Sequence, residues 1–565
     1  MDKTLLLYMK NKIIISLLVL IFSIGALLRL YHLGSTPPSL NWDEVSLGYN
    51  AWSILTTGRD EYGDFLPVIL RSYDDYKPAL YSYFLIPLIA LAGISDVIVR
   101  LPSALFGSLG IVLVYFLVKE IFRGKTIEFS NTKVDTRFLG LAASFLFAVS
   151  PWDIQFSRIA FESQVGTILN LLSLLFFLKG VRRGVFFPLS FLFASLSIHM
   201  YQSEKVFVPL MLLFISLLNI KKIWASQKYY YLIGVVIAFV VALPLLVNIA
   251  TNKDVLLRAK GVSVFSNQTS LLSRSSQKLI ADRNAGYIPG LVMDNRRVEF
   301  VRQVGAGYLS HFDINWLFIS GDIGRHHAPS MGLLYLWELP ILLIGIYLLA
   351  FIKVKREVKI LLVGYLLLVP IPASITSGVP HAVRTMNFLG ILEIVMAMGL
   401  LQICIWAFAK RSTLKMILFG GLILFAFLNF SYYLNQYFVQ QNYYNSIDWL
   451  YGYRQAVDFI QPIHKKYPQI VVSNAQPLDQ SHMFFLFYTQ YPPEKYLKEG
   501  GTASGGFRES GNKFSNYIFR PIDWNSEKAG DLIVGRPSDI PSDVRPLKII
   551  KYLNGVPAIV IAEKK

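Results

Sequence analysis

The sequence contains a single cysteine, Cys404, which lies inside an apolar run. One cysteine excludes an intrachain disulfide and any metal site built from several cysteines, and a small buried hydrophobe is its expected role. Charged residues are also scarce, at 16% of the 565 residues, whereas soluble globular domains carry about 25%. With a hydrophobic content of 54%, this composition excludes a soluble multidomain protein.

Several functional signatures are missing as well. We find no glycine-rich phosphate-binding loop, serine nucleophile elbow or zinc-binding signature, which argues against a nucleotide-driven pump and against donors bound through a soluble nucleotide fold. The net charge of +18 does not indicate a nucleic-acid partner, because the basic residues fall in short clusters between apolar runs. The positive-inside rule produces that placement.

Apolar runs repeatedly approach the roughly 20 residues needed to cross a bilayer core. The first run follows Lys3, Lys10 and Lys12 without a cleavage pattern, so we interpret it as a retained span with its N-terminus inside. We predict about eleven membrane-spanning helices, at residues 13–32, 97–118, 137–150, 163–179, 185–200, 206–220, 229–249, 331–352, 359–377, 386–408 and 414–432. The predicted fold class is a polytopic α-helical protein of the cell membrane.

Basic loops set the predicted orientation, because positive charge favours the cytoplasmic side. The apolar segment 79–92 is too short to be counted as a span, so we place it as a helix on or dipping into the outer face. The long outer loops then cover about residues 34–96 and 250–330. The loops predicted to face the cytoplasm carry Arg123 and Lys125, Arg182 and Arg183, Lys221 and Lys222, Lys353, Lys355 and Arg356, and Lys410 and Arg411.

After residue 432 the composition becomes polar, and short apolar strands alternate with a helical pattern. This predicts a membrane domain over 1–432 and a small extracytoplasmic α/β domain over 433–565. The pattern favours one amphipathic helix over 447–465 and strands over 470–472, 517–519, 532–534 and 558–561.

The strongest chemical signal is Asn41-Trp42-Asp43-Glu44, directly after the first span. Partial desolvation of carboxylates at the membrane surface suits a general base that works near neutral pH. Asp43 is the first candidate and Glu44 a close second. The alternative is a solvated loop rich in carboxylates, which composition alone favours.

A second signal consists of basic residues at predicted outer ends of spans. Arginines that lie on the outer side against the positive-inside bias are functional candidates, and a guanidinium group can bind phosphate through two hydrogen bonds. Each of these side chains could instead extend its charged end to the membrane surface or pair with a nearby carboxylate. As a set they favour anion binding. The residues are Lys77, Arg100, Arg158, Arg325 with His326 and His327, His381 and Arg384.

Two features near these basic residues leave alternatives open. Asp153 and Glu162 flank Arg158, and they could orient it, contact a sugar or neutralise charge. The His326-His327 pair next to Asp322 could suggest a metal, but no second cluster at ligand spacing accompanies it, so hydrogen bonding to phosphate or sugar is preferred. No metal ligand is assigned, and a requirement for a divalent metal stays open.

The order of motifs resembles that of a known group. Trp42-Asp43-Glu44 follows the first span, Lys77-Pro78 precedes an apolar surface helix, Arg100-Leu101-Pro102 opens the second span, and Ser157-Arg158 with Glu162 marks the third outer-facing turn. Over about residues 13–400 the chain resembles the multispanning GT-C glycosyltransferases, especially the family of protein O-mannosyltransferases, lipid A aminoarabinose transferases and their bacterial relatives.

The resemblance implies a GT-C fold and inverting transfer of a monosaccharide from a dolichyl- or undecaprenyl-phosphate donor to a hydroxyl of a protein, lipid or glycan. It implies that Asp43 or Glu44 acts as the base. The donor phosphate would meet Lys77, Arg325, His326, His381 and Arg384, and the site would be organised by Arg100, Asp153, Arg158 and Glu162.

Two other functions remain open on the sequence. A lipid or solute transporter would also have many spans, although it would more often place charges near mid-membrane within paired repeats. A polysaccharide ligase or polymerase would use a lipid-pyrophosphate donor and a large basic outer loop, and residues 252–302 are long and basic enough for one. The C-terminal domain departs from the mannosyltransferase pattern, which leaves the acceptor open.

Overall fold

The computed structural model describes residues 11–73, 75–124, 126–129, 132–252, 254, 261–266, 269–351, 354–409, 412–505 and 510–565. The chain forms two compact units. Unit 1 comprises Met1–Gly25, Leu109–Asp153 and Gly166–Phe430, and unit 2 comprises Ala26–Ser108, Ile154–Val165 and Ser431–Lys565. Some basic residues used above to orient the spans lie outside the described residues, namely Lys3, Lys10, Lys125, Lys353, Lys410 and Arg411.

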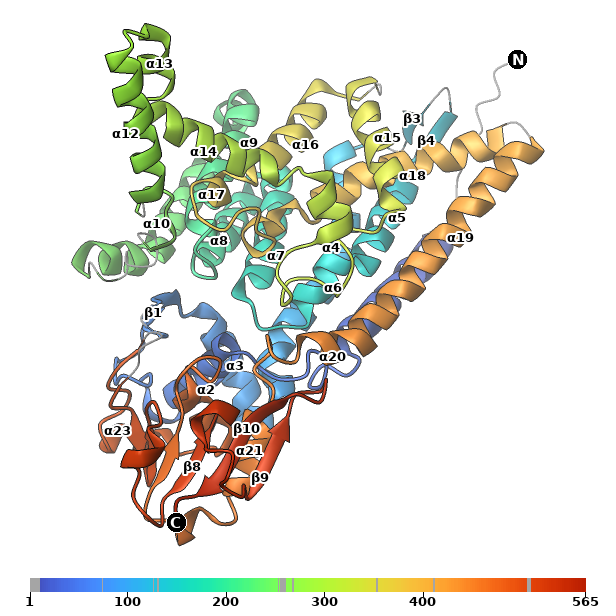
Figure 1. The fold of residues 1–565 in the computed structure, drawn as a ribbon. Coiled ribbons are helices and arrows are strands. Elements are labelled where there is room, and N and C mark those ends of the chain that lie inside the picture. The colour runs from blue at the N-terminus through green and yellow to red at the C-terminus, as the bar shows by residue number, and fades with distance from the viewer. Residues whose placement is uncertain are drawn as a thin grey trace, which may run out of the picture. The chain divides into compact units, whose positions relative to one another are not determined.

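Long apolar helices dominate the fold (Figure 1). Within the described residues, eight helical segments are long and apolar enough to cross a membrane. They are α1 (Asn11–Leu30), α4 (Asp96–Phe122), α7 (Glu162–Gly180), α9 (Glu204–Ser226), α10 (Lys228–Thr251), the pair α16 (Arg356–Leu368) and α17 (Ile371–Ser374), α18 (Ile391–Ala409) and α19 (Thr413–Asn435). The prediction of a polytopic α-helical membrane protein is confirmed.

A bent pair of helices, if counted as one span, brings the number to nine within the described residues. α5 (Thr136–Val149) and α6 (Pro151–Ser157) meet at an angle of 57°. The residue between them, Ser150, is extended with φ −56° and ψ 120°, as the residue before a proline prefers. The proline at position 151 therefore accounts for the bend.

The two remaining predicted spans coincide with shorter apolar helices. α8 (Phe187–Ile198) follows the short helix η1 (Gly184–Phe186), and α15 (Glu338–Phe351) begins seven residues after the predicted start at 331. Oε2 of Glu338 accepts the backbone N–H of Tyr335 (2.9 Å), which fixes the segment just before α15 to the first residue of the helix. The predicted surface helix is also present, as the 13-residue α3 (Leu80–Ala92).

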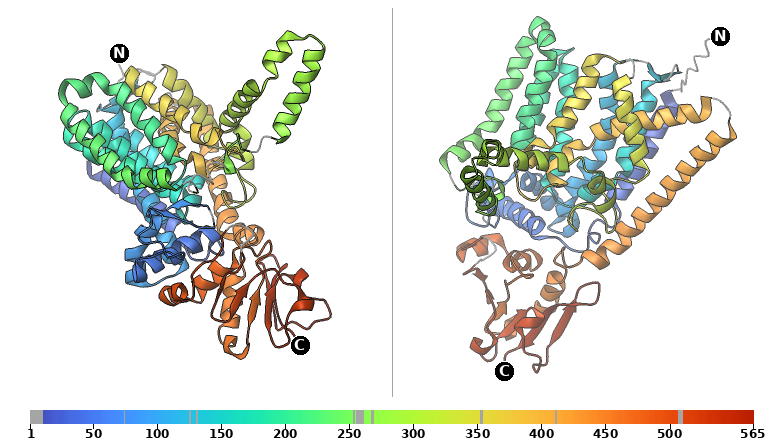
Figure 2. Two further views of the ribbon diagram at one scale, coloured as in Figure 1. Left: turned by 90° about the vertical axis from the view of Figure 1, so that its left-hand side faces the viewer. Right: turned by 45° about the horizontal axis from the view of Figure 1, so that its top comes forward.

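Unit 1 is held together by close helix packing. A Cβ added to Gly345 would lie 2.1 Å from the carbonyl oxygen of Val395, and one added to Gly399 would lie 1.9 Å from that of Ile341. These glycines allow the backbones of α15 and α18 to come into direct contact, as small residues do between helices in membrane proteins. The predicted outer loop 250–330 contains helices α12 (Thr269–Asn284), α13 (Ile288–Met293) and α14 (Arg296–Ser310), and α12 with α13 stands out from the other helices of unit 1 in Figure 2.

Unit 2 contains a mixed six-stranded sheet from the C-terminal region, in the order β6-β7-β5-β8-β10-β9. β5 is parallel to both of its neighbours, whereas β10 is antiparallel to β8 and β9. All four predicted strands are confirmed, and β6 and β9 add two more. The strands are β5 (Ile470–Val472), β6 (Lys513–Phe514), β7 (Tyr517–Phe519), β8 (Leu532–Gly535), β9 (Lys548–Lys551) and β10 (Pro557–Glu563).

The helix predicted over 447–465 is wrong in its bounds. Residues 446–452 form turns, and α21 covers only Tyr453–Ile460. Gly452 has φ 127°, a conformation that no helical residue adopts and that glycine tolerates, so the helix begins after it. Pro462 lacks a backbone N–H and ends the helix.

The sheet does not stand alone within unit 2. The helix after the first span, α2 (Trp42–Thr57), packs against α22 (Ser481–Tyr488) and α23 (Pro493–Lys498) of the C-terminal region. A Cβ on Gly48 would lie 2.7 Å from the ring of Phe487, so glycine allows this approach. The segment that carries Asp43 and Glu44 is therefore folded against the C-terminal α/β region.

Candidate functional site

The acidic pair lies in the first turn of α2, not in a loop as the sequence suggested. Asn41 is the N-cap: its side-chain oxygen accepts the backbone N–H of Glu44 (3.1 Å), and Oε2 of Glu44 accepts the backbone N–H of Asn41 (3.0 Å). This reciprocal pair is a capping box. It fixes the start of the helix and, with it, the directions of the Asp43 and Glu44 side chains.

Glu44 is a fully buried carboxylate whose oxygens accept four hydrogen bonds. Oε1 accepts from Nε of Arg100 (2.9 Å) and from the backbone N–H of Ala160 (2.9 Å). Oε2 accepts from Nη2 of Arg100 (3.2 Å) in addition to the capping bond with Asn41 (3.0 Å). An ionised carboxylate offers about four lone-pair positions. Its contacts therefore favour a structural role over that of a base.

Arg100 uses all five of its N–H donors. Besides the bonds to Glu44, Nη1 donates to the carbonyls of Leu33 (3.1 Å) and Pro37 (2.9 Å), and Nη2 donates to that of Ser39. The side chain is fully buried. Arg100 therefore fixes the backbone between the first span and α2, as the organising role implied by the resemblance would require.

Arg158 holds the end of the first span in a similar way. Its Nη1 donates to the carbonyls of Leu28 (3.0 Å) and Arg29 (3.1 Å), and Nη2 donates to those of His32 (3.3 Å) and Thr36 (2.8 Å). The last carbonyls of a helix lack partners within it and carry partial negative charge. A buried guanidinium thus caps α1 and orients the segment that leads to the acidic pair.

Asp43 is the more accessible of the two acids. Its side chain is 23% exposed, whereas that of Glu44 is fully buried. Asp43 forms an ion pair and a hydrogen bond with Nζ of Lys77, which also lies 3.9 Å from Oδ2 of Asp75. Glu162, at the start of α7, interacts electrostatically with both Asp43 and Lys77.

A short hairpin presents Lys77 to the acidic turn. β1 (Ile69–Leu70) pairs antiparallel with β2 (Lys77–Pro78), so that Leu70 lies opposite Lys77. The connecting segment is tied to α2, because the hydroxyl of Tyr73 donates to the carbonyl of Trp42 (2.9 Å). Six predicted site residues thus belong to unit 2: Asp43, Glu44, Lys77, Arg100, Arg158 and Glu162.

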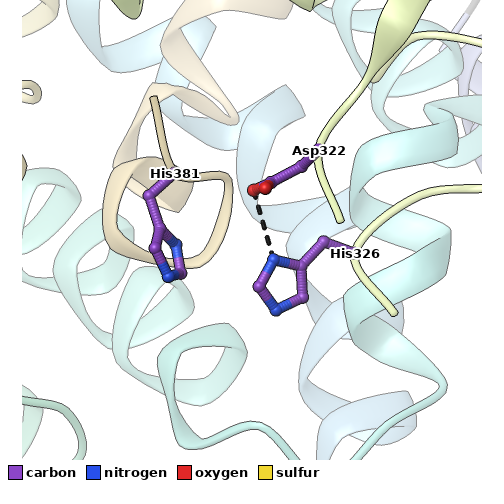
Figure 3. Close-up of side chains that lie close together, drawn as sticks. All are labelled: Asp322, His326 and His381. Carbon is purple, nitrogen blue, oxygen red and sulfur yellow. Dashed lines mark hydrogen bonds and ion pairs between the residues drawn. The ribbon is translucent and has the colours of Figure 1, made fainter. Parts of the chain in front are cut away.

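The other predicted site residues belong to unit 1, where two of them meet an aspartate (Figure 3). The ligand atoms of Asp322, His326 and His381 all lie within 4.8 Å of one another. Nδ1 of His326 donates to Oδ2 of Asp322 (3.1 Å). The ring centroids of His326 and His381 are 5.2 Å apart, and the angle between the ring planes is 43°. The sequence analysis placed His326 and His381 together only as expected phosphate contacts, and it did not predict their grouping with Asp322, because His381 lies far from both residues along the chain.

The backbone and a third histidine fix this cluster. Oδ2 of Asp322 also accepts the backbone N–H of Ala382 (2.6 Å). Nδ1 of His311 donates to the carbonyl of Gly307 (2.7 Å), and its Nε2 accepts the backbone N–H of His381 (3.2 Å). The hydrogen bonds therefore assign a neutral tautomer to His311. The sequence analysis did not single out His311.

Burial governs the protonation of the cluster. It would raise the pKa of Asp322, but the hydrogen bond from His326, the electrostatic interactions with both imidazoles and the N–H of Ala382 together hold that pKa well below its usual value. Burial lowers the pKa of His326 despite the bond to Asp322, and it lowers that of His381 with help from the charge of Arg384. At neutral pH the cluster is an ionised carboxylate beside neutral imidazoles.

Three further predicted residues lie in unit 1. Arg384, in the short helix η4 (Val383–Phe388), donates from Nη1 to the carbonyl of Ser377 (2.7 Å) and to the hydroxyl of Thr376. Arg325 is half-buried in the segment between Asp322 and His326. Asp153 is fully buried in α6.

Unit 1 also contains a buried carboxylate in the first turn of α9. Glu204 accepts hydrogen bonds from Nδ2 of Asn170 (2.6 Å) and from Nδ2 of Asn387 (2.9 and 3.1 Å). These amides satisfy a carboxylate that would otherwise be costly inside a bundle. Asn170, Glu204 and Asn387 lie far apart along the chain, so the sequence alone does not predict that they form hydrogen bonds with one another.

Part of the chain matches a known family. Residues 76–247 match the family described as dolichyl-phosphate-mannose-protein mannosyltransferase. The match includes Lys77, Arg100, Asp153, Arg158 and Glu162, whereas Asp43 and Glu44 precede it. A comparison with curated protein sequences found no match.

Solved structures provide the fold comparison. ArnT from Cupriavidus metallidurans, in a crystal structure with undecaprenyl phosphate, is 14% identical with a TM-score of 0.55, over 97% of this chain and 98% of that one. The oligosaccharyltransferase of Archaeoglobus fulgidus is 12% identical, with TM-scores of 0.48 in its apo form and 0.49 with a tethered acceptor peptide. This chain spans 64% and 63% of those two structures, and scores at that level do not establish a common fold.

The family match and the fold therefore agree with the family resemblance that we inferred from the order of the sequence motifs. The predicted GT-C fold, with its many spans and a C-terminal domain, is confirmed. Over residues 76–247 the chain is therefore similar to the dolichyl-phosphate-mannose-protein mannosyltransferases, and its fold is similar to that of ArnT from Cupriavidus metallidurans.

Proposed function

We propose that the protein transfers a monosaccharide from a polyprenyl-phosphate donor to an acceptor hydroxyl, with inversion, at the outer face of the membrane. The fold of ArnT, which was crystallised with undecaprenyl phosphate, supports the class of the donor. The family description, with its dolichyl-phosphate-linked mannose, supports it as well. The sugar and the acceptor stay open.

The observation that carries the proposal is the Asp43–Lys77 pair. A partly exposed carboxylate in a fixed helical turn meets a lysine from a hairpin, and the neighbouring acid, Glu44, is fully engaged with Arg100 and the backbone. A general base must be reachable by its substrate and held in place by its surroundings. Asp43 meets both conditions, and we assign it as the base.

The chemical step follows from these roles. Asp43 takes the proton of the acceptor hydroxyl as that oxygen forms a bond with the anomeric carbon of the sugar. The bond between the anomeric carbon and the phosphate oxygen breaks, and polyprenyl phosphate leaves with the electron pair. Cations stabilise the negative charge that develops on the leaving phosphate; Lys77, Arg325 and Arg384 are our candidates.

The histidines suit this role less well. In the tautomer set by Asp322, the one N–H of His326 donates to that carboxylate, and Nε2 offers only a lone pair. Neutral imidazoles also lack the charge that a departing phosphate calls for. The candidate phosphate contacts are therefore Lys77 in unit 2 and, separately, Arg325 and Arg384 in unit 1.

Removing these cations is expected to weaken donor binding. A hydrogen bond to a charged group contributes about 1.5–3 kcal/mol, so Lys77→Ala, Arg325→Ala and Arg384→Ala should each lower the affinity for undecaprenyl phosphate about tenfold or more. The measurement is titration of undecaprenyl phosphate against purified variants. Lys498→Ala, which removes an exposed lysine, should leave the affinity unchanged. Affinities unchanged in all three variants would show that these cations serve the fold or the topology.

Topology offers a separate test, since the proposal requires the C-terminal region outside and the loop near 354–359 inside. The single Cys404 makes the experiment simple: on a Cys404→Ser background, Asn554→Cys and Glu357→Cys each provide one exposed thiol. A membrane-impermeant maleimide should label the Asn554→Cys variant from outside intact cells, and the Glu357→Cys variant only after permeabilisation. Labelling of both from one side would contradict the orientation.

A further inference from the structure

The cluster of Asp322, His326 and His381 has the chemistry of a metal site. Two segments of unit 1 build it: Asp322 and His326 follow the π-helical turn η3 (Trp316–Ser320), and His381 precedes η4 (Val383–Phe388). Figure 3 shows the Asp322 carboxylate and the two imidazoles turned toward one common space. One carboxylate and two imidazoles form a donor set that zinc accepts readily, whereas magnesium prefers oxygen ligands alone.

One ring nitrogen of the cluster, Nδ1 of His381, is a candidate metal ligand. Nδ1 of His381 is buried, and it has no hydrogen-bond partner among the residues that the structure describes. Buried polar atoms are nearly always satisfied. A cation bound between the two rings would satisfy this one, and it would bind His326 through the lone pair of Nε2, because Nδ1 of that ring donates to Asp322.

The surroundings already hold the ligands in place. Backbone N–H groups of Ile323 (2.8 Å) and Ala382 (2.6 Å) bond to the Asp322 carboxylate, and His311 accepts the backbone N–H of His381 (3.2 Å). Metal sites rely on such outer partners to orient their ligands. Here they link the segment that bears Asp322 to the segment that bears His381.

We propose that Asp322, His326 and His381 bind one zinc ion, which leaves a fourth position for water or another oxygen ligand. Zinc bonds to imidazole and carboxylate are about 2.0–2.2 Å long, so two ligand atoms of one ion lie at most about 4 Å apart. The present separations reach up to 4.8 Å, and modest rotations of the two rings would close the difference. The inference goes beyond sugar transfer and holds whether or not Asp43 is the base.

Zinc binding by the purified full chain tests the proposal. Untagged protein in lipid nanodiscs would be stripped with a chelator and titrated with zinc chloride, and bound zinc would be counted by elemental mass spectrometry. We expect one zinc ion per chain and a rise in thermal stability on binding. His381→Ala and Asp322→Asn should lower the zinc affinity by more than the roughly 10–100-fold that is typical of losing an outer-shell partner.

The adjacent His327 provides a matched control. Its Nδ1 bonds to the carbonyl of Met331 (2.9 Å), away from the cluster, so His327→Ala should bind zinc as the wild type does. His381→Gln, which keeps a side chain of similar length, replaces His381→Ala if that variant does not fold. Equal zinc content in the wild type and the His381 variant would overturn the proposal, and so would a folded wild type that binds no zinc.

Discussion

Asp43→Asn is expected to lower the rate of sugar transfer by about 10²–10⁴, the usual cost of losing a general base. The amide keeps the size of the side chain but cannot take the proton of the acceptor hydroxyl. Folding should be largely retained, because Asp43 is partly exposed and the oxygen of the asparagine amide can still accept a hydrogen bond from Lys77. The rate is measured with a synthetic polyprenyl-phosphate sugar, and stability by thermal unfolding.

Asp75→Asn is the matched control. Asp75 lies 3.9 Å from the same lysine and has a similar exposure, 27% against 23% for Asp43. The same chemical change at this position should leave most of the activity in place. A folded Asp43→Asn protein with turnover near that of the wild type would remove Asp43 from the mechanism.

Arg100→Met is expected to produce the largest loss of stability. The change leaves the Glu44 carboxylate buried without its cation, and breaking a buried ion pair by removing one partner costs about 3–5 kcal/mol. Three backbone carbonyls also lose their donor. Thermal unfolding of the purified variant should therefore show a clearly lowered midpoint.

Two further variants sharpen this test. Adding Glu44→Gln to Arg100→Met removes the stranded charge and should restore part of the lost stability. Arg59→Met removes an exposed arginine that donates to the nearby carbonyl of Gly63 (2.6 Å) and lies over the ring of Phe65, and it should change the midpoint little. If Arg100→Met unfolded at the same temperature as the wild type, Arg100 would not support the acidic turn.

Much of the membrane fold could be predicted because each span is encoded locally. An apolar run of about 20 residues identifies a helix wherever it lies in the chain. The strands with apolar cores, such as Ile470–Val472, were identified for the same reason. β6 (Lys513–Phe514) and β9 (Lys548–Lys551) were not predicted because they are short and begin with charged residues.

One error in the acidic segment could have been avoided. Asn41 and Glu44 stand three residues apart, the spacing of a capping box, which marks the start of a helix. Read that way, the sequence would have placed Asp43 in a helical turn and Glu44 in a capping role. The distinction between the two acids depends on their partners, Arg100 and Lys77, which come from distant segments.

The cluster in unit 1 could not be predicted in the same way. Sequence reasoning noticed the His326-His327 pair beside Asp322, and it set a metal aside because no second cluster at ligand spacing accompanied the pair. The third ligand, His381, lies in another segment. Backbone hydrogen bonds from His381 to His311 and from Ala382 to Asp322 hold that segment in place. Contacts between such distant segments depend on tertiary packing, and no local sequence pattern predicts them.

The central claim is that polyprenyl phosphate is the leaving group, and its release can be measured without knowledge of the acceptor. Membranes that contain the protein would be supplied with a panel of synthetic polyprenyl-phosphate monosaccharides, and the lipid products would be identified by mass spectrometry. We predict that one sugar is consumed with release of polyprenyl phosphate by the wild type and not by Asp43→Asn. No release from any of these donors, together with release of polyprenyl pyrophosphate from pyrophosphate-linked donors, would contradict the account.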